Sequence, residues 1–229
     1  IDIWSDVMCP WCVIGYKHLE RALAELAGEI EAEIRWLPFE LNPDMPPEGE
    51  ESTAHIARKY RRTPEQAAAG RAMMAERAAA AGFPFDYVGQ GDPPPAMLWN
   101  TFDAHKLLYW ARETAGPAAQ TRLKLALFAA HFQQRRNVGD RAVLLDVAEE
   151  QGFERAAADA AFDDPQIAEA VRAEEQLAWE NNVSGVPAMV FDRAFIVPGA
   201  QEPETYVNLL RKVVARRPKN STGPGTSPG

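Results

Sequence analysis

Cysteine is scarce in this chain, and there is no sign of a membrane span or of a basic surface. The 229 residues include two cysteines, Cys9 and Cys12, too few for a secreted scaffold held together by disulfides. No apolar run approaches the roughly 18 residues that a membrane-spanning helix needs. With 24 Lys and Arg against 33 Asp and Glu, the net charge of −9 argues against a nucleic-acid or anionic-membrane surface.

The remaining composition is that of an ordinary globular protein, with 46% hydrophobic and 25% charged residues. The length allows one large domain or a domain with an insertion. No signal-peptide pattern precedes the first predicted strand, although the chain opens at Ile1 rather than at a methionine, so upstream residues can be missing. We expect a cytoplasmic protein that binds neither nucleic acid nor membranes. Its oligomeric state cannot be predicted from these features.

The two cysteines belong to one motif, Cys9-Pro10-Trp11-Cys12, at the predicted start of a helix. A short apolar run rich in Ile and Trp precedes them and favours a buried strand, while Val13–Leu26 has apolar residues at helical spacing. Unpaired N–H groups and the helix dipole stabilise an anion at a helix N-terminus, so we expect the pKa of Cys9 to fall below its usual value of about 8.5. Cys9 would exchange with a substrate disulfide, and Cys12 would resolve the mixed disulfide.

Two other interpretations of the cysteine pair are open. A zinc site needs about four ligands, and the four histidines show no His-x-x-x-His spacing that would complete it. A structural disulfide across two residues would close too small a loop to add much stability. We therefore prefer the redox interpretation. It also accounts for Pro10, whose missing N–H costs nothing in the first helical turn, and for Trp11, which offers an apolar face beside the sulfurs.

The segments at both ends of the chain predict parts of one sheet. Glu31–Leu37 alternates apolar and polar residues like a half-buried strand, which completes a strand–helix–strand unit of parallel, right-handed connection. Ala188–Phe191 and Ala194–Val197 predict an antiparallel hairpin that turns at Asp192-Arg193. Gln201–Arg216 predicts a closing helix.

Between these ends the pattern is helical. Thr63-Pro64-Glu65-Gln66 has the residues of a capping box with proline at the first helical position. The loop Phe83–Pro95 is dense in Gly, Pro and aromatic residues, and it is either a binding wall or a plain connection. Residues 218–229 have the composition of a disordered tail. The other predicted helices are Asn100–Ala115, Gln120–Arg135, Asp140–Gln151, Glu154–Phe162 and Pro165–Asn181.

Together these segments resemble the thioredoxin fold, and the long helical block is similar to the DsbA-type plan, in which a helical domain is inserted into that fold. Within this superfamily the chain is most similar to the FrnE-type DsbA-like oxidoreductases. Besides the cysteine motif with Gly15, the similar stretches are Pro38-Phe39-Glu40-Leu41-Asn42-Pro43, Asn100-Thr101 with Ala104-His105, Leu127-Phe128 with Phe132, Gly185-Val186-Pro187 and Val197-Pro198-Gly199-Ala200-Gln201.

The resemblance implies an α/β thioredoxin fold, with a central mixed sheet and flanking helices, that carries a large all-helical insertion. Residues 1–43 and 183–217 would form a discontinuous thioredoxin-like domain, and residues 44–182 the inserted helical domain.

The resemblance also assigns roles to single residues. Cys9 matches the family's nucleophile, Cys12 its resolving cysteine, and Pro187 its cis-proline, with Val186 facing the active-site disulfide. A cis turn would leave the backbone groups of Val186 free to pair with a substrate strand, whereas an ordinary trans proline at a strand start is the alternative. No metal is expected. The expected substrate-binding residues are Pro10, Trp11, Val186 and Pro187.

Two departures from the family pattern affect these expectations. Trp11 stands where DsbA has a histidine between its cysteines, so a cationic stabiliser of the thiolate is absent. We therefore expect a potential less oxidising than that of DsbA, about −120 mV. The buried acid that relays protons in many thioredoxin-fold enzymes has no clear counterpart, and Asp2 and Glu40 are the candidates.

The sequence thus predicts a thiol-disulfide oxidoreductase acting on disulfide- or thiol-bearing proteins or small molecules. It needs no bound cofactor, and glutathione is a candidate thiol co-substrate. Two alternatives stay open. Kappa-class glutathione transferases and 2-hydroxychromene-2-carboxylate isomerases share the inserted plan, but they characteristically carry serine where Cys9 stands. A non-catalytic module would instead hold an extended peptide in a groove around Trp11, Phe83, Phe85 and Pro187.

Overall fold

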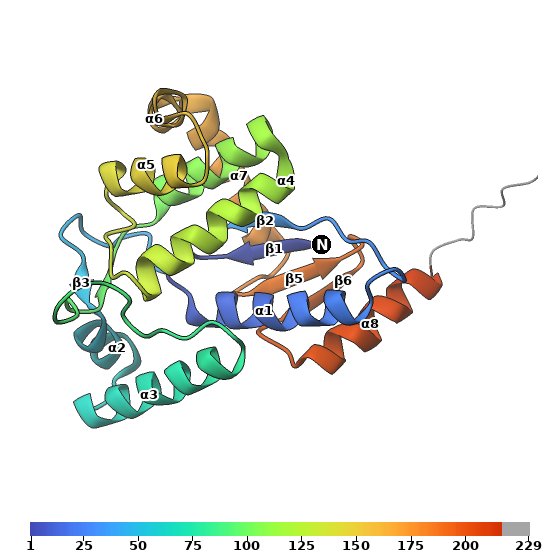
Figure 1. Ribbon diagram of the computed structural model, residues 1–229, viewed down its shortest axis with the longest axis horizontal. Helices are drawn as coiled ribbons and strands as arrows, with labels where there is room; N and C mark the ends of the chain where they lie inside the picture. Colours follow the sequence, from blue (N-terminus) through green and yellow to red (C-terminus); the bar gives the residue numbers. More distant parts are fainter. Residues whose placement is uncertain (217–229) are drawn as a thin grey trace, which may run out of the picture.

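A four-stranded mixed sheet, in the order β2-β1-β5-β6, lies at the centre of the computed structural model, which describes residues 1–216 (Figure 1). β1 (Asp2–Ser5) pairs in parallel with β2 (Arg35–Pro38) and antiparallel with β5 (Ala188–Phe191). β5 pairs antiparallel with β6 (Phe195–Pro198). The predicted hairpin and the predicted strand–helix–strand unit are therefore both confirmed.

Helices cover both faces of the sheet, and the alternation of side chains along β1 decides which helices each face meets. Ile3 belongs to a buried cluster with residues of α1 (Pro10–Glu25) and α8 (Pro203–Arg216), two helices that lie side by side in Figure 1. Trp4, the next residue, belongs to a different cluster that includes a residue of α7 (Pro165–Glu180).

The longest helix, α4 (Phe102–Phe132), joins the inserted region to the sheet. The sequence predicts two helices here, and α4 indeed consists of two helical stretches that meet at a break at Gly116, whose φ of 83° favours glycine. Pro117 follows the break, where its missing N–H interrupts no helical hydrogen bond. In the second half, Gln120 hydrogen-bonds both backbone groups of Trp36 in β2, at 2.8 and 2.9 Å. These bonds fix the second half of α4 against the edge of the sheet.

The remaining helices of the inserted region begin at side-chain caps. α3 (Pro64–Ala80) starts with the predicted capping box, in which Thr63 and Gln66 exchange hydrogen bonds between side chain and backbone. α2 (Ser52–Tyr60) has no counterpart among the predicted helices, because its cap is the carboxylate of Glu51, outside the usual set of N-cap residues. The helices that lie close to their predicted positions are α5 (Arg141–Glu150), α6 (Arg155–Asp163) and α7.

The inserted region, predicted to be all-helical, also contains a small sheet. β3 (Glu50–Glu51) and β4 (Met97–Leu98) pair antiparallel over two residues each. Strands this short have no alternation of apolar and polar residues, so no sequence pattern marks them. The division into a discontinuous thioredoxin-like domain and an insertion over residues 44–182 stays a prediction. Residues 217–229, which include the predicted tail, lie outside the described residues.

Candidate active site

The two cysteines lie at the start of α1, as the motif predicts. Cys9 is the N-cap residue, with extended backbone, and half-buried Pro10 follows at the beginning of the helix. The backbone N–H of Cys9 donates to the carbonyl of Asp6 at 3.2 Å, and that of Cys12 donates to the carbonyl of Cys9 at 3.1 Å. Both cysteines are free thiols. The turn after β1 therefore places two sulfur-bearing side chains within one helical turn.

Cys9 faces the segment that enters β5. Its Sγ donates to the carbonyl oxygen of Val186 at 3.5 Å, and the Val186–Pro187 peptide bond is cis. Cys9 is 3% exposed, whereas Cys12 is fully buried. The structure thus brings Cys9, Cys12, Val186 and Pro187 together, and Cys9 is the more accessible of the two thiols.

Trp11 forms part of the surroundings of the cysteines together with residues of the inserted region. The guanidinium carbon of Arg77 in α3 lies 5.5 Å from the centre of the half-buried Trp11 ring. Trp11 and Phe85 pack against the same buried cluster, and Phe85 stacks on Phe132 with the ring centroids 4.3 Å apart. The beginning of the loop Phe83–Pro95 therefore lies beside the helix that carries the cysteines.

The pKa of the Cys9 thiol is raised well above its usual value, so the expectation of a lowered pKa is wrong. The largest cause is its hydrogen bond with the Cys12 side chain, followed by burial, and the charge of Asp6 acts in the same direction. The backbone N–H of Cys12 opposes them. The expectation counted only the unpaired N–H groups of the helix, whereas the folded chain adds a second sulfur, a carboxylate and exclusion of water.

Replacing Cys12 with alanine should lower the pKa of Cys9, because it removes the largest cause of the raised value. The pH dependence of the rate of alkylation by iodoacetamide measures this pKa, and we expect its midpoint to fall. Cys12→Ser is the matched control, since a hydroxyl group keeps a hydrogen-bonding partner next to the sulfur. An unchanged midpoint in Cys12→Ala would show that burial and the charge of Asp6, rather than the Cys12 side chain, raise the pKa.

Asp6, in the turn between β1 and α1, is a buried acid that is absent from the sequence predictions. The residue is fully buried, and its carboxylate accepts hydrogen bonds from the backbone N–H groups of Leu41 at 2.8 Å and Met8 at 3.2 Å. Burial raises the pKa of Asp6, although these hydrogen bonds act against the rise. The carbonyl of Asp6 also holds the N–H of Cys9, so this acid is part of the turn that positions the nucleophile.

Lys124, one turn after Gln120 on α4, is a second buried charged residue that the sequence predictions omit. It is fully buried, and its Nζ donates to the carbonyl of Ser5 at 3.4 Å. Burial lowers the pKa of Lys124 to about 8, while the nearby Cys12 and Asp6 act in the opposite direction. A lysine between Leu123 and Leu127, on the apolar side of a helix, is the pattern that could have identified it.

The two acids that the sequence offers for proton relay have other partners. Asp2, at the start of β1, pairs with the guanidinium of Arg35 at 2.7 and 2.8 Å. The Glu40 carboxylate binds the guanidinium of Arg172, and burial raises the pKa of Glu40 to about 7. The acid whose charge acts on Cys9 is instead Asp6.

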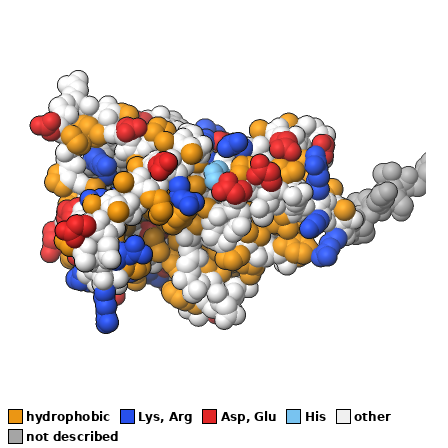
Figure 2. Space-filling view, turned by 90° about the horizontal axis from the view of Figure 1, so that it is seen from below, with side chains coloured by type: hydrophobic (Ala, Val, Ile, Leu, Met, Phe, Trp, Pro, Cys, Tyr) orange, Lys and Arg blue, Asp and Glu red, His pale blue; other side chains and the backbone are white. Residues whose placement is uncertain are grey.

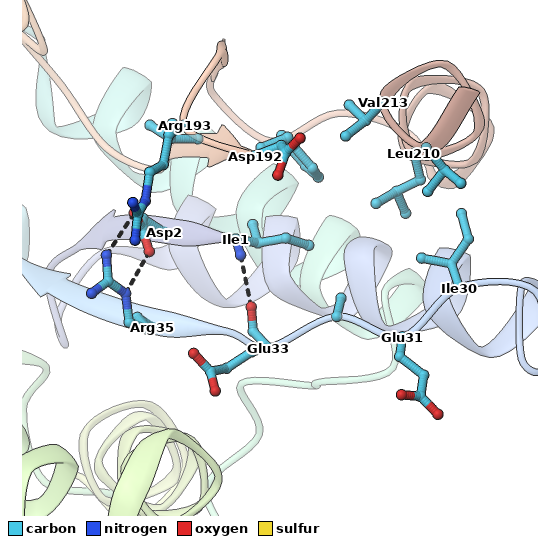
Figure 3. Close-up of a pocket in the computed structure, with 14 residues that line it drawn as sticks. Ile1, Asp2, Ile30, Glu31, Glu33, Arg35, Asp192, Arg193, Leu210 and Val213 are labelled. Atoms are coloured by element: carbon cyan, nitrogen blue, oxygen red, sulfur yellow. Dashed lines mark hydrogen bonds and ion pairs between the residues drawn. The ribbon is translucent and has the colours of Figure 1, made fainter. Parts of the chain in front are cut away.

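A pocket of about 420 Å³ lies at the opposite end of β1 from the cysteines (Figure 3). Figure 3 shows the Asp2–Arg35 pair and the bond from the Ile1 ammonium to the Glu33 carbonyl, 2.7 Å long, along one side of it. Leu210 and Val213 of α8 contribute apolar side chains. Neither cysteine lines this pocket, so its position does not support a role in sulfur chemistry.

On the face seen in Figure 2, acidic and basic side chains lie interspersed among hydrophobic ones. Within residues 1–216, no group of three or more His, Cys, Asp or Glu side chains could hold a metal ion. In the same part of the chain, no helix is both long enough and apolar enough to cross a bilayer.

Comparison with known proteins supplies the family. The profile of the DSBA-like thioredoxin domain matches residues 1–211. The crystal structure of a probable DsbA oxidoreductase from Streptomyces coelicolor is 31% identical, with a TM-score of 0.84, over 100% of this chain and 98% of that one. At 21% identity, the cytosolic disulfide reductase DsbM from Pseudomonas aeruginosa shares the fold, with a TM-score of 0.59 over 93% and 98% of the two chains. A 2-hydroxychromene-2-carboxylate isomerase, 17% identical, has a TM-score of 0.61 over 94% of each chain.

Proposed function

Because the chain belongs to the DSBA-like thioredoxin domain family, we propose that it is a thiol-disulfide oxidoreductase with Cys9 and Cys12 as its redox pair. The observation that carries the proposal is the placement of the two thiols. Cys9 caps α1, Cys12 lies in the same turn, and the Sγ of Cys9 is 3.5 Å from the carbonyl oxygen of Val186. This arrangement places the two cysteines in one helical turn, the spacing that a redox pair needs.

The difference in burial between the thiols supports a fixed order of events. In the oxidising direction, a substrate thiolate attacks the Sγ of Cys9 in the Cys9–Cys12 disulfide, and Cys12 leaves with the bonding electron pair as a thiolate. A second thiolate of the substrate then attacks the substrate sulfur that is bonded to Cys9 in the mixed disulfide, and Cys9 leaves as a thiolate. The two electrons pass to the protein pair, and the reducing direction is the reverse.

The raised pKa of Cys9 supports a potential less oxidising than that of DsbA. A strongly oxidising pair has a stabilised thiolate, and in this chain the Cys12 hydrogen bond, burial and Asp6 all disfavour the Cys9 thiolate. We propose disulfide- or thiol-bearing proteins or small molecules as substrates and glutathione as thiol co-substrate. A second structure of DsbM contains GSH, which makes glutathione the natural first probe. A cytosolic setting stays a prediction, supported by the description of DsbM as cytosolic.

Equilibration of the protein with mixtures of reduced and oxidised glutathione tests the proposal. Counting free thiols at each ratio should show Cys9 and Cys12 oxidised together, with a potential more negative than about −120 mV. A potential as oxidising as that of DsbA would contradict the argument that the surroundings of Cys9 disfavour its thiolate. If neither thiol changes at any ratio, the oxidoreductase proposal is wrong and a peptide-binding module is favoured.

The isomerase alternative has one observation in its favour, the shared fold with 2-hydroxychromene-2-carboxylate isomerase. Chemistry of that kind does not need a second cysteine, so a Cys12→Ala variant separates the two functions. The proposal predicts that this variant stops at the mixed disulfide on Cys9 and no longer completes disulfide exchange. Isomerase activity that survives in Cys12→Ala would favour the isomerase function over the oxidoreductase function.

A further inference from the structure

Lys124 stands in a setting that stability alone does not explain. Its side chain is fully buried, and Nζ lies 5.4 and 5.1 Å from the ring centroids of Trp36 and Phe128. An ammonium group has three donors, and the hydrogen bond found for Nζ is the one to the Ser5 carbonyl. No carboxylate within residues 1–216 is in ion-pair contact with it. A buried charge without a direct counter-ion is costly, so its position calls for a role.

A second buried lysine on the same helix shows what an ordinary structural arrangement looks like. Lys106 is 8% exposed, and its Nζ pairs with the carboxylate of Asp103 at 2.6 Å and donates to the Phe162 carbonyl, also at 2.6 Å. It likewise lies over two aromatic rings. The contrast is in the counter-ion: Lys106 has a carboxylate, whereas the anions whose charges act on Lys124 are those of Cys12, Asp6 and Cys9.

We propose that Lys124 is a positioning residue whose positive charge stabilises the Cys12 thiolate during disulfide exchange. This inference rests on the proposed function. When a substrate thiolate attacks Cys9, the S–S bond breaks and Cys12 takes the electron pair with no proton transferred. The negative charge therefore moves from the substrate to a fully buried sulfur, where water cannot solvate it. The ammonium of Lys124 compensates this charge in place of water.

The other titratable and charged groups around Lys124 come from several elements. Burial keeps the pKa of His105 well below its usual range, so this histidine is neutral and does not supply the compensating charge. Its Nε2 lies 3.9 Å from Oδ1 of Asp6 and has no hydrogen-bond partner among the described residues. Asp6 opposes a thiolate, as its effect on Cys9 shows. The remaining neighbours are Tyr109 and Glu174, which line a small cavity with Lys124, and Arg112, which pairs with Glu174.

The pH dependence of disulfide exchange follows from the lowered pKa of Lys124. Because the pKa of Lys124 is lowered to about 8, the ammonium is present below that pH and is lost as the pH rises through it. The stabilisation of the Cys12 thiolate should disappear over the same range. We therefore expect the rate at which the glutathione thiolate opens the Cys9–Cys12 disulfide, corrected for the ionisation of glutathione itself, to show an inflection near pH 8 in the unmodified protein.

The test is Lys124→Met, with Lys106→Met as the matched control. Removing the ammonium should slow the attack of glutathione on the Cys9–Cys12 disulfide at pH 7 by at least about tenfold. It should also abolish the inflection near pH 8. Lys106→Met, which removes a buried charge from the same helix, should leave both readouts unchanged.

A rate of exchange and a pH profile in Lys124→Met equal to those of the unmodified protein would overturn the inference and leave the proposed function standing. Failure of the unmodified protein to exchange with glutathione would instead refute the proposed function. If Lys124→Met does not fold, Asp6→Asn is the second variant, since it removes a charge that raises the pKa of Lys124. Its inflection should then lie below pH 8, and an inflection that does not move overturns the inference.

Discussion

Replacing Cys9 with serine should lower the rate of disulfide exchange by at least about 10³-fold and leave the fold intact. A serine hydroxyl ionises far less readily than a thiol and cannot form the S–S bond with Cys12, so both directions of the reaction are lost. The hydroxyl can still donate to the Val186 carbonyl, as the Sγ of Cys9 does, which is why we expect little change in stability. Reduction of glutathione disulfide measures the rate, and thermal unfolding followed by circular dichroism measures the fold.

Cys12→Ser is the informative partner of this variant. It keeps Cys9, so the first step can proceed and a mixed disulfide with glutathione should accumulate, detectable by mass spectrometry. Exchange that persists in Cys9→Ser would place the reactive sulfur elsewhere. Because Cys9 and Cys12 are the two cysteines of the chain, Cys12 would then have to react from a fully buried position.

Replacing Phe128 with alanine should reduce the free energy of unfolding by about 3–5 kcal/mol. The ring is fully buried, and it packs edge-on against Trp36 with the centroids 6.0 Å apart. It also lies in the same hydrophobic cluster as Cys9 and Cys12, so it joins α4 to the helix that carries the cysteines. Truncation removes apolar contacts and leaves a cavity. The surrounding side chains are closely packed, so they cannot move far enough to fill it.

Urea denaturation monitored by tryptophan fluorescence checks this value. Val88→Ala is the control, because that side chain is 65% exposed and its removal should change stability by no more than about 0.5 kcal/mol. A loss below about 1 kcal/mol in Phe128→Ala would mean that the interface between α4 and the sheet can rearrange around the missing ring.

The elements that could be predicted from the sequence are those with local signals. Pro10 and the apolar spacing after Cys12 identify α1, the capping box at Thr63 identifies α3, and the alternation around Asp192 identifies the hairpin. The missed elements lack such signals. The two-residue strands β3 and β4 have no periodicity, and α2 depends on an unusual cap at Glu51.

The candidate site also has residues that the sequence identifies and properties that depend on folding. Cys9 and Cys12 are identified by their spacing, but the pKa of Cys9 depends on groups that only folding brings near it, which is why a local argument gave the wrong direction. Lys124 is far beyond Cys12 in the chain and comes from α4. Its relation to the sulfurs depends on how α4 docks on β2, and sequence periodicity does not fix that docking.

The docking of α4 has a consequence for protein engineering. Gln120, Lys124 and Phe128 follow one another at intervals of four residues, and they contact the strand edge, the Ser5 carbonyl and the aromatic cluster in turn. A chimera that exchanges the helical segment for that of a relative would therefore also replace the side chains that adjoin the reactive centre. The helical segment cannot be transplanted as a neutral module, and its donor would help to determine the chemistry of the recipient.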